Sequence, residues 1–256
     1  MSLKALVRAV VPAAVRVPAR KLTHHAMVRV ARSFPVLKLK ARRELEFWES
    51  LIAAHGVDPQ PDYYRRFMLA MGGLDSPAVF AGKLCVDIGC GPKGSLTWLD
   101  GIARAALGVD PLADEYMKLG IARHAMVYLQ AGAEKLPFPS GYADVVFSMN
   151  SLDHVDDLRA ACREIRRILK PGGAFIASLN LDEPATFTEP WTLTESFLDA
   201  SLFDGWICEF RQTCPRLPDE EEGWGPYRYM FEEPPAELLQ AQGPRALWCR
   251  YRRPND

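Results

Sequence analysis

The chain has 256 residues, of which 48% are hydrophobic and 25% charged, and its formal net charge is −1. This composition is typical of a soluble globular protein, and the length suits one α/β domain of about 200 residues with an appendage. No run approaches the roughly 20 apolar residues that a membrane-spanning helix needs. The six cysteines form no C-x-x-C pair, so we expect buried thiols in a cytoplasmic protein and no metal site.

Charge is unevenly distributed along the chain. Residues 1–43 hold eleven Lys and Arg and no acidic residue, so all 32 Asp and Glu follow them. We predict a basic N-terminal arm over 1–43 on an acidic body. An anionic membrane surface, contacted peripherally, or a second subunit are its candidate partners, and a merely solvated run of charge is the simplest alternative. Nucleic acid is disfavoured because the body is acidic and no RNA-binding module is recognisable.

Two helices are predicted next, in a cap region over 44–80. The stretch "RRELEFWESLIAAH" (42–55) has an apolar face, and Gly56 ends it. A second helix runs through "YYRRFMLAM" (63–71) to a glycine pair. Because residues 45–71 lie outside the part of the chain that carries the cofactor motifs, we expect them to roof the acceptor pocket together with the loop 213–244.

Beyond Lys83, short apolar strands alternate with helical patterns. Strands separated by helical crossovers predict a parallel α/β sheet wound on both faces, with ligands at the carboxyl ends of the strands. Segment 213–244 is rich in Pro, acids and aromatics, and we predict a lid-like insertion there. The predicted strands are 84–88, 105–109, 126–129, 144–149, 173–179, 206–212 and 246–252, and the predicted helices 94–103, 113–123, 157–169 and 191–202.

The stretch "VDIGCGPKG" (86–94) fits two nucleotide-site patterns. Gly89, Gly91 and Gly94 satisfy G-x-G-x-x-G, which is associated with the pyrophosphate of NAD or FAD, and the following helix would present its N-terminus to the ligand. Asp110 closes the second strand, 21 residues after Gly89, where a carboxylate can accept hydrogen bonds from ribose hydroxyls. Neither feature separates NAD from S-adenosylmethionine (SAM), since both contain an adenosine ribose.

Asp87 separates the two cofactors. It lies two residues before the first glycine, at the tip of the first strand. A pyrophosphate would be repelled there, whereas SAM carries an ammonium and a sulfonium. A unit charge pair at about 4 Å is worth roughly 1 kcal/mol in water and about 4 kcal/mol near a protein surface. The sign of the charge therefore favours SAM.

Further segments strengthen this interpretation. "AEKLPF" (133–138), "ADVVFSMNSLDHV" (143–155) and "EIRRILKPGGAFIAS" (164–178) follow the glycine loop in order. Over residues 83–180 the chain resembles the class I SAM-dependent methyltransferases, especially the methyltransferase type 11 group. The resemblance implies a Rossmann-like seven-stranded, mostly parallel, doubly wound sheet whose reversed last strand is "ALWCRYRR", within a SAM-binding domain over 81–256.

The same resemblance implies SAM as cofactor and a set of residues around it. Asp87 would meet the methionine ammonium, Asp110 the ribose, and Ala133 with Glu134 the adenine. Two positions depart from the family: Lys93 stands where a third glycine is common, and Gly132 where an adenine-binding Asp is usual. The complete set is Asp87, Gly89, Cys90, Gly91, Asp110, Pro111, Ala133, Glu134, Asn150 and Ser151.

His154 and Asp153 are the candidate catalytic pair. They follow the fourth strand, and an oxygen acceptor must lose a proton to a group such as an imidazole. The stretch "GVDPLADEY" (108–116) resembles methyltransferases encoded with surface-glycan synthesis. This resemblance implies methyl transfer to a small-molecule acceptor, an oxygen of a sugar or of another hydroxylated metabolite. Alternatively, His154 only shapes the pocket wall. A SAM-fold binding or assembly protein without catalysis, and an NAD-linked oxidoreductase, are the rival functions.

Overall fold

The computed structural model describes residues 36–217, 225–240 and 243–255. Most of the predicted basic arm (1–35) and the middle of the predicted lid (218–224) lie outside the described residues, so the partners of the arm stay a prediction. The last eight residues of that arm, 36–43, belong to a helix, α3. The predicted border at residue 43 thus falls inside a helix.

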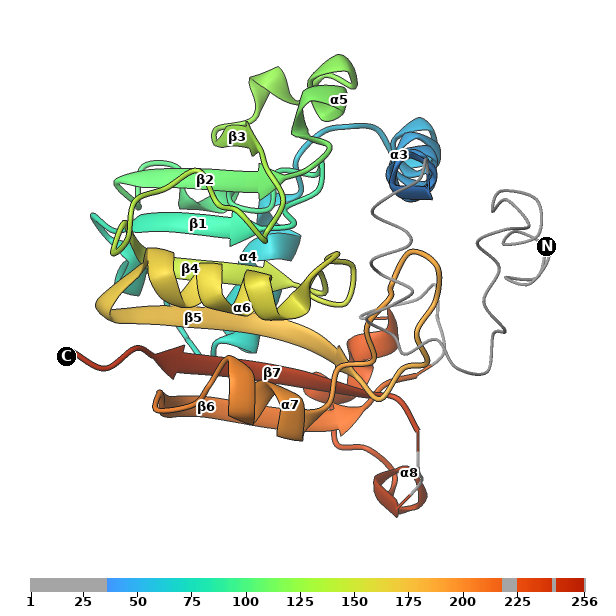
Figure 1. Ribbon diagram of the computed structural model, residues 1–256, viewed down its shortest axis with the longest axis vertical. Coiled ribbons are helices and arrows are strands. Elements are labelled where there is room, and N and C mark those ends of the chain that lie inside the picture. The colour runs from blue at the N-terminus through green and yellow to red at the C-terminus, as the bar shows by residue number, and fades with distance from the viewer. Residues whose placement is uncertain (1–35, 218–224, 241–242, 256) are drawn as a thin grey trace, which may run out of the picture.

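Seven strands form one sheet in the order β3-β2-β1-β4-β5-β7-β6 (Figure 1). Neighbours from β3 to β5 pair in parallel, whereas β7 pairs antiparallel with both β5 and β6. The predicted Rossmann-like sheet with a reversed last strand is confirmed. The strands are β1 (Leu84–Ile88), β2 (Ala105–Asp110), β3 (Val127–Gln130), β4 (Ala143–Met149), β5 (Leu169–Leu181), β6 (Ile207–Pro215) and β7 (Arg245–Arg252).

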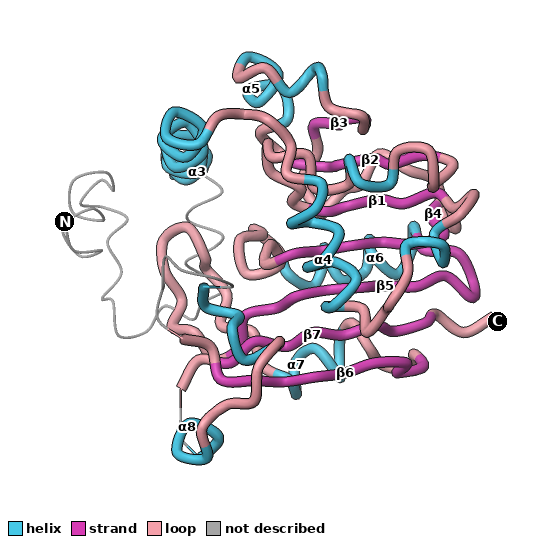
Figure 2. Tube along the Cα trace, turned by 180° about the vertical axis from the view of Figure 1, so that it is seen from behind, coloured by secondary structure: helices cyan, strands magenta, loops and turns pink. Residues whose placement is uncertain are grey.

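Helices cover both faces of the sheet. α6 and α7 lie on one face and α4 on the other, as the two opposite views show (Figures 1 and 2). α3 lies apart from both faces, beyond the edge at which β1, β2 and β4 end. The helices are α3 (Val36–His55), α4 (Pro61–Met71), α5 (Ala113–Lys118), α6 (Leu158–Ile168), α7 (Glu195–Ser201) and α8 (Ala236–Gln240), with 3-10 turns at Pro77–Phe80, Thr97–Leu99, Ile121–Arg123 and Gly225–Met230.

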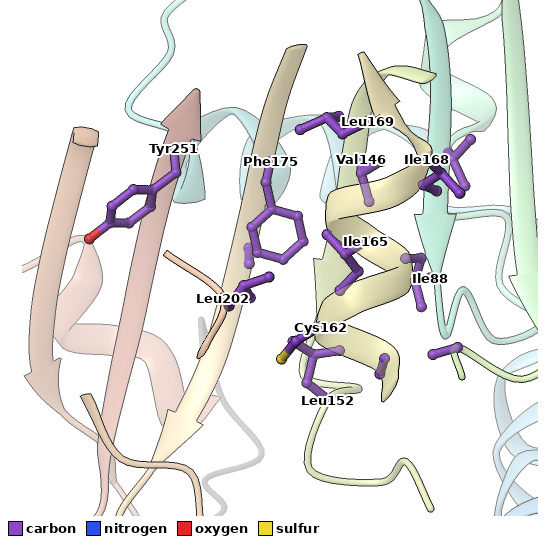
Figure 3. Packing of buried hydrophobic residues seen from close by; sticks show 14 of the residues in the cluster. Ile88, Val146, Leu152, Cys162, Ile165, Ile168, Leu169, Phe175, Leu202 and Tyr251 are labelled. Carbon is purple, nitrogen blue, oxygen red and sulfur yellow. The ribbon is translucent and has the colours of Figure 1, made fainter. Parts of the chain in front are cut away.

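The helix α6 shows how the sequence determines a local element. Asp157 caps its first turn, because the carboxylate accepts a 3.1 Å hydrogen bond from the Ala160 N–H. Buried residues then recur every three or four positions on the face toward the sheet, where they meet β1, β4 and β5 (Figure 3). These residues are Leu158, Ala161, Cys162, Ile165 and Ile168.

The helix predicted over 94–103 is wrong. That segment forms turns and one short 3-10 turn, Thr97–Leu99. Gly94 and Gly101 both have positive φ values, 70° and 72°, which no right-handed helix allows. The segment is buried from Gly94 to Leu99, so it packs as part of the core. No helix N-terminus follows the glycine loop to receive a ligand.

Other predicted elements agree in kind and differ in extent. The helix expected over 113–123 divides into α5 and a 3-10 turn. The helix expected over 191–202 covers only 195–201, and β6 continues to Pro215, into the predicted lid. Within the described part of the chain, no helix has the length and apolar character needed to cross a membrane.

Candidate active site

Asp87, near the carboxyl end of β1, is a buried carboxylate with one free oxygen. Its Oδ2 accepts a 2.5 Å hydrogen bond from the Ser95 hydroxyl, while Oδ1 has no hydrogen-bond partner. Burial raises the pKa of Asp87 to about 7; the Ser95 bond acts against that rise and the charge of Asp110 adds to it. A buried acceptor without a donor is costly. Asp87 is therefore suited to meet a cationic group of a ligand.

Asp110, the last residue of β2, organises the neighbouring loop. Its Oδ2 accepts from the Gly91 N–H at 3.1 Å and its Oδ1 from the Leu112 N–H at 2.9 Å. Burial raises the pKa of Asp110, and these two hydrogen bonds act against the rise. The Tyr116 side chain also hydrogen-bonds to this carboxylate. A carboxylate has about four acceptor sites, so Asp110 can still accept a hydrogen bond from a further hydroxyl donor, such as that of a ribose.

The two glycines of the loop make room for protein side chains. A Cβ on Gly89 would lie 2.3 Å from the Ser151 Cβ, and a Cβ on Gly91 would lie 2.9 Å from the Trp48 ring. Ser151 also donates to the Ile88 carbonyl at 2.7 Å, so it ties the loop after β4 to β1. Trp48 comes from α3. The loop therefore lies between these two side chains.

The region expected to border the adenine has an additional structural role. Glu134 Oε1 accepts hydrogen bonds from the Asp156 and Asp157 N–H groups, at 2.6 and 3.1 Å, just before α6. A Cβ on Gly132 would lie 2.6 Å from Glu134 Oε2. A larger residue at 132 would therefore require the carboxylate end of Glu134 to shift. Ala133 is buried between them.

The remaining predicted cofactor residues lie at the same edge. Cys90 is buried against β2, where a Cβ on Gly108 would collide with its sulfur. Pro111 follows Asp110 and its carbonyl accepts from Gln130 at 3.2 Å. Lys93, at the position where the family often has glycine, is buried and donates to the Gly56 carbonyl at 2.6 Å. The lysine that replaces the usual glycine therefore connects the loop to the end of α3.

These residues fit SAM. Asp87 offers an unpaired buried acceptor to an ammonium, and Asp110 keeps acceptor capacity for a ribose hydroxyl. The loop between them is held by the hydrogen bond from the Gly91 N–H to Asp110. The ammonium of SAM would supply the hydrogen-bond donor and the opposite charge that Asp87 Oδ1 lacks.

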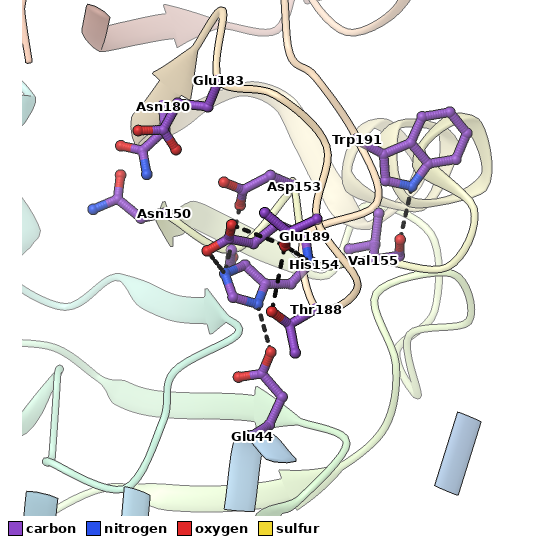
Figure 4. A network of polar contacts seen from close by, with 12 residues as sticks. Glu44, Asn150, Asp153, His154, Val155, Asn180, Glu183, Thr188, Glu189 and Trp191 are labelled. Carbon is purple, nitrogen blue, oxygen red and sulfur yellow. Dashed lines mark hydrogen bonds and ion pairs between the residues drawn. The ribbon is translucent and has the colours of Figure 1, made fainter. Parts of the chain in front are cut away.

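A second group of polar side chains lies beyond β4 and β5. Asn150 has a positive φ of 49° and accepts a 2.9 Å hydrogen bond from the Ser178 hydroxyl. Asn180 is buried at the end of β5 and accepts from the Tyr227 hydroxyl at 3.0 Å. Asn150, Asn180 and the carboxylate of Asp153 lie around one space (Figure 4). Amides and a carboxylate provide both donors and acceptors, as hydroxyl groups require.

His154 lies among carboxylates from three segments. Its Nδ1 is 2.9 Å from Glu44 Oε1, and its Nε2 is 3.9 Å from Asp153 Oδ1 and 3.6 Å from Glu189 Oε1 (Figure 4). Burial lowers the pKa of His154, but the Glu44 hydrogen bond and the charges of Asp153, Glu44 and Glu189 outweigh it, so the pKa is raised. Burial raises the pKa of Asp153 to about 6, opposed by His154. Asp153 Oδ1 has no hydrogen-bond partner.

Several residues of this group were not anticipated from the sequence. Glu44 comes from α3, and Asn180, Glu183 and Glu189 come from the end of β5 and the loop after it. They lie between 26 and 110 residues from His154, and no spacing rule joins them. Residues from the predicted cap (44–80) reach this group through α3. A contact from α3 also comes from Lys40, which precedes the predicted start of the cap.

Comparisons with known proteins agree with this arrangement. Residues 86–177 match the family described as methyltransferase domain, Methyltransf_11. A ubiquinone/menaquinone biosynthesis C-methyltransferase, UbiE, of Rubrivivax gelatinosus is 34% identical over 129 residues, 50% of this chain and 51% of that protein. A sterol 4-C-methyltransferase, strm-1, of Caenorhabditis elegans is 31% identical over 99 residues, 36% of this chain and 29% of that protein. The chain thus spans about half, or less, of the length of these relatives.

Solved structures share the fold at low identity. The [4+2]-cyclase SpnF superposes with a TM-score of 0.52 and 20% identity, over 75% of this chain and 80% of that one. Such a likeness shows the fold alone, and the name of this neighbour is that of a cyclase. The matched family, the order of the strands and the carboxylates at the ends of β1 and β2 agree on one assignment. Residues 86–177 are those of a methyltransferase domain of the Methyltransf_11 family, the sheet has the fold of the class I SAM-dependent methyltransferases, and the cofactor is SAM.

Proposed function

We propose that this protein transfers a methyl group from SAM to an oxygen of a small hydroxylated acceptor, such as a sugar. The observation that supports the proposal best is the group of polar side chains beyond β4, in which Asn150 and Asn180 lie on one side of the His154 and Asp153 pair (Figure 4). An apolar acceptor would leave Asp153 Oδ1 unpaired, and a buried polar group without a hydrogen bond costs about 1–3 kcal/mol.

SAM, when bound, supplies a methyl group activated by its sulfonium. The side chains of the protein then have three tasks. Asp87 and Asp110 hold charged and hydroxyl groups at the ends of β1 and β2. Asn150 and Asn180 orient the acceptor. His154, through Nε2, takes the proton that the acceptor hydroxyl must lose.

The electrostatics of the site define when His154 can act as a base. An imidazole accepts a proton only in its neutral form. Because the pKa of His154 is raised, we expect turnover to increase with pH through a value above about 6.5, the ordinary pKa of histidine.

Methyl transfer to carbon is the second candidate, because two relatives are C-methyltransferases by name. Carbon acceptors such as quinols and sterols are largely apolar. The two candidates differ in the product, since the methyl proton resonance separates O–CH₃ from C–CH₃. A protein that binds SAM without transferring its methyl group is the third.

Calorimetric titration with SAM, S-adenosylhomocysteine (SAH) and NADH is the first test. We expect SAM and SAH to bind and NADH not to bind. Transfer of labelled methyl from SAM is then measured over sugars, polyols, phenols and quinols. Methylation of carbon would exclude the proposal in favour of the second candidate, and SAM binding without transfer to any acceptor would favour the third.

A further inference from the structure

One face of α3 lies along the whole active-site edge. Lys40, Glu44 and Trp48 are spaced by four residues, so they project from the same side of the helix. Lys40 donates to the His154 carbonyl and, at 3.0 Å, to Asp156; Trp48 lies over Gly91. Glu44, between them, reaches the His154 ring at 2.9 Å.

Both ends of this helix are held. Near its beginning, Lys40 and Asp156 form an ion pair in which the lysine side chain is 16% exposed. At its end, the buried Lys93 donates to the Gly56 carbonyl, where a cation also meets the negative end of the helix dipole. The axial position of Glu44 is therefore defined by contacts on either side of it.

The Glu44 contact determines which nitrogen of His154 is free. A carboxylate can only accept, so Nδ1 must carry the hydrogen in the 2.9 Å bond with Glu44 Oε1. In the neutral ring, Nε2 then holds the lone pair. Nε2 is the atom nearer Asp153 and Glu189, on the side of the polar space beyond β4.

We propose that Glu44 is the positioning residue of His154: from α3 it holds the imidazole in the tautomer whose Nε2 faces the acceptor. Glu44 itself does not touch the acceptor. The proposal rests on the proposed function, in which His154 is the base. It also makes α3 part of the active site, although the helix precedes the matched family region by some thirty residues.

The other charged groups around His154 do not replace Glu44. Asp153 and Glu189 face Nε2 at 3.9 and 3.6 Å, beyond hydrogen-bond distance. Lys40 contacts the backbone of His154 and is paired with Asp156. Among the described residues, Glu44 alone hydrogen-bonds to the ring, so it alone can select the tautomer.

The experiment compares Glu44→Gln with Glu46→Gln in the full chain. Glu46 lies on the same helix, is exposed, and forms a surface ion pair with Arg42, the one partner of its carboxylate within the described part of the chain. It therefore controls for the loss of one negative charge. The pKa of His154 is followed by NMR titration of the ring, with His154→Gln to identify the signal. Nitrogen shifts report the tautomer.

We expect Glu44→Gln to lower the pKa of His154 and to reduce the fraction of the Nδ1–H tautomer, whereas Glu46→Gln changes neither. In turnover, kcat should fall about tenfold to a hundredfold, less than the roughly 10²- to 10⁴-fold that loss of a general base costs. The pH limb should move to lower pH with an unchanged KM for SAM. Glu44→Asp keeps the charge on a shorter side chain. The pKa of His154 should therefore stay close to the wild-type value, whereas the fraction of the Nδ1–H tautomer should fall.

An unchanged His154 pKa and tautomer in Glu44→Gln would overturn the proposal, and so would equal effects of the Glu44 and Glu46 substitutions. Both readouts are independent of turnover. If no acceptor is methylated while the NMR shifts appear, Glu44 still positions His154 and the proposed function fails. If methylation of an acceptor oxygen occurs while the NMR shifts are absent, the proposed function stands and the role of Glu44 fails.

Discussion

The cofactor side and the proposed acceptor side of the candidate active site are built in different ways. On the cofactor side, Asp87, the glycine loop and Asp110 come from one β1-to-β2 unit, and the Gly91 N–H already bonds to Asp110. On the acceptor side, α3, the β4 loop and the segment after β5 each contribute a carboxylate to a single imidazole. A local site tolerates changes elsewhere in the chain, whereas an assembled site depends on how distant elements pack.

The largest effect is expected at His154. If its Nε2 takes the acceptor proton, His154→Gln should lower kcat about 10²- to 10⁴-fold and remove the pH-dependent limb. SAM affinity should hardly change, because the cofactor side does not use this ring. Steady-state kinetics over pH and titration with SAM test both parts. A fall of less than tenfold with the limb retained would make His154 a wall residue.

The next effect concerns the charge buried at Asp87. Its pKa in the folded protein, about 7, exceeds the ordinary value of 3.8, so the folded state keeps a proton that the unfolded chain loses. The stability of the SAM-free protein should therefore fall as pH rises from about 4 to 7, by at most about 4 kcal/mol. Asp87→Asn should flatten this fall in denaturant titrations.

Asp153 acts in the same direction, since its pKa is raised to about 6, and so part of the pH dependence should remain in Asp87→Asn. Asp100→Asn, at an exposed position, is the control. Parallel curves for wild type and Asp87→Asn would contradict the prediction. SAM should also bind more tightly to wild type as pH rises through about 7, when the Asp87 carboxylate becomes charged.

A smaller effect is expected at Asp110. Asp110→Ala removes the acceptor for the ribose and for two N–H groups of the loop. SAM and SAH should bind about 1.5–3 kcal/mol more weakly, the usual range for hydrogen bonds to charged groups. Calorimetry measures the affinity, and thermal unfolding shows whether the loop has also been destabilised. Unchanged affinity in a folded variant would remove Asp110 from the site.

The smallest effect tests how α3 meets the cofactor loop. Gly91 and Gly82 both have positive φ, 55° and 67°, but a Cβ meets Trp48 at the first position and nothing within 4 Å at the second. Alanine at either position should cost about 1–2 kcal/mol for the backbone. Gly91→Ala should cost about 1–3 kcal/mol more for the crowding. Denaturant titration measures both.

In a Trp48→Ala background, Gly91→Ala should lose most of the additional cost that comes from crowding, because the ring that the new Cβ would meet is absent. If the two alanine variants unfold alike, α3 does not press on the loop in solution, and the two sides of the site are more independent than the contacts indicate.

Much of this molecule was determined by its sequence alone. Alternating strands and helices predicted the sheet, and Asp87 with the glycine loop indicated SAM before any contact was known. The reason is locality: strand ends, turns and caps depend on residues within about ten positions. The helix predicted over 94–103 is the exception, and its absence also has a local cause. Gly94 and Gly101 take the left-handed conformation, which the helical pattern of the sequence did not indicate.

Only the tertiary structure decided the acceptor side. Glu44 meets His154 across 110 residues, and Glu189 approaches the other ring nitrogen from the loop after β5. Neither has a spacing that distinguishes it from a surface carboxylate. Their meeting depends on where α3 lies, which follows from its packing against Tyr116 and Leu112 and from the Lys40 and Lys93 contacts at its ends. Packing between distant segments is a property of the whole fold, so a reading of local pattern could identify His154 but not the residue that orients it.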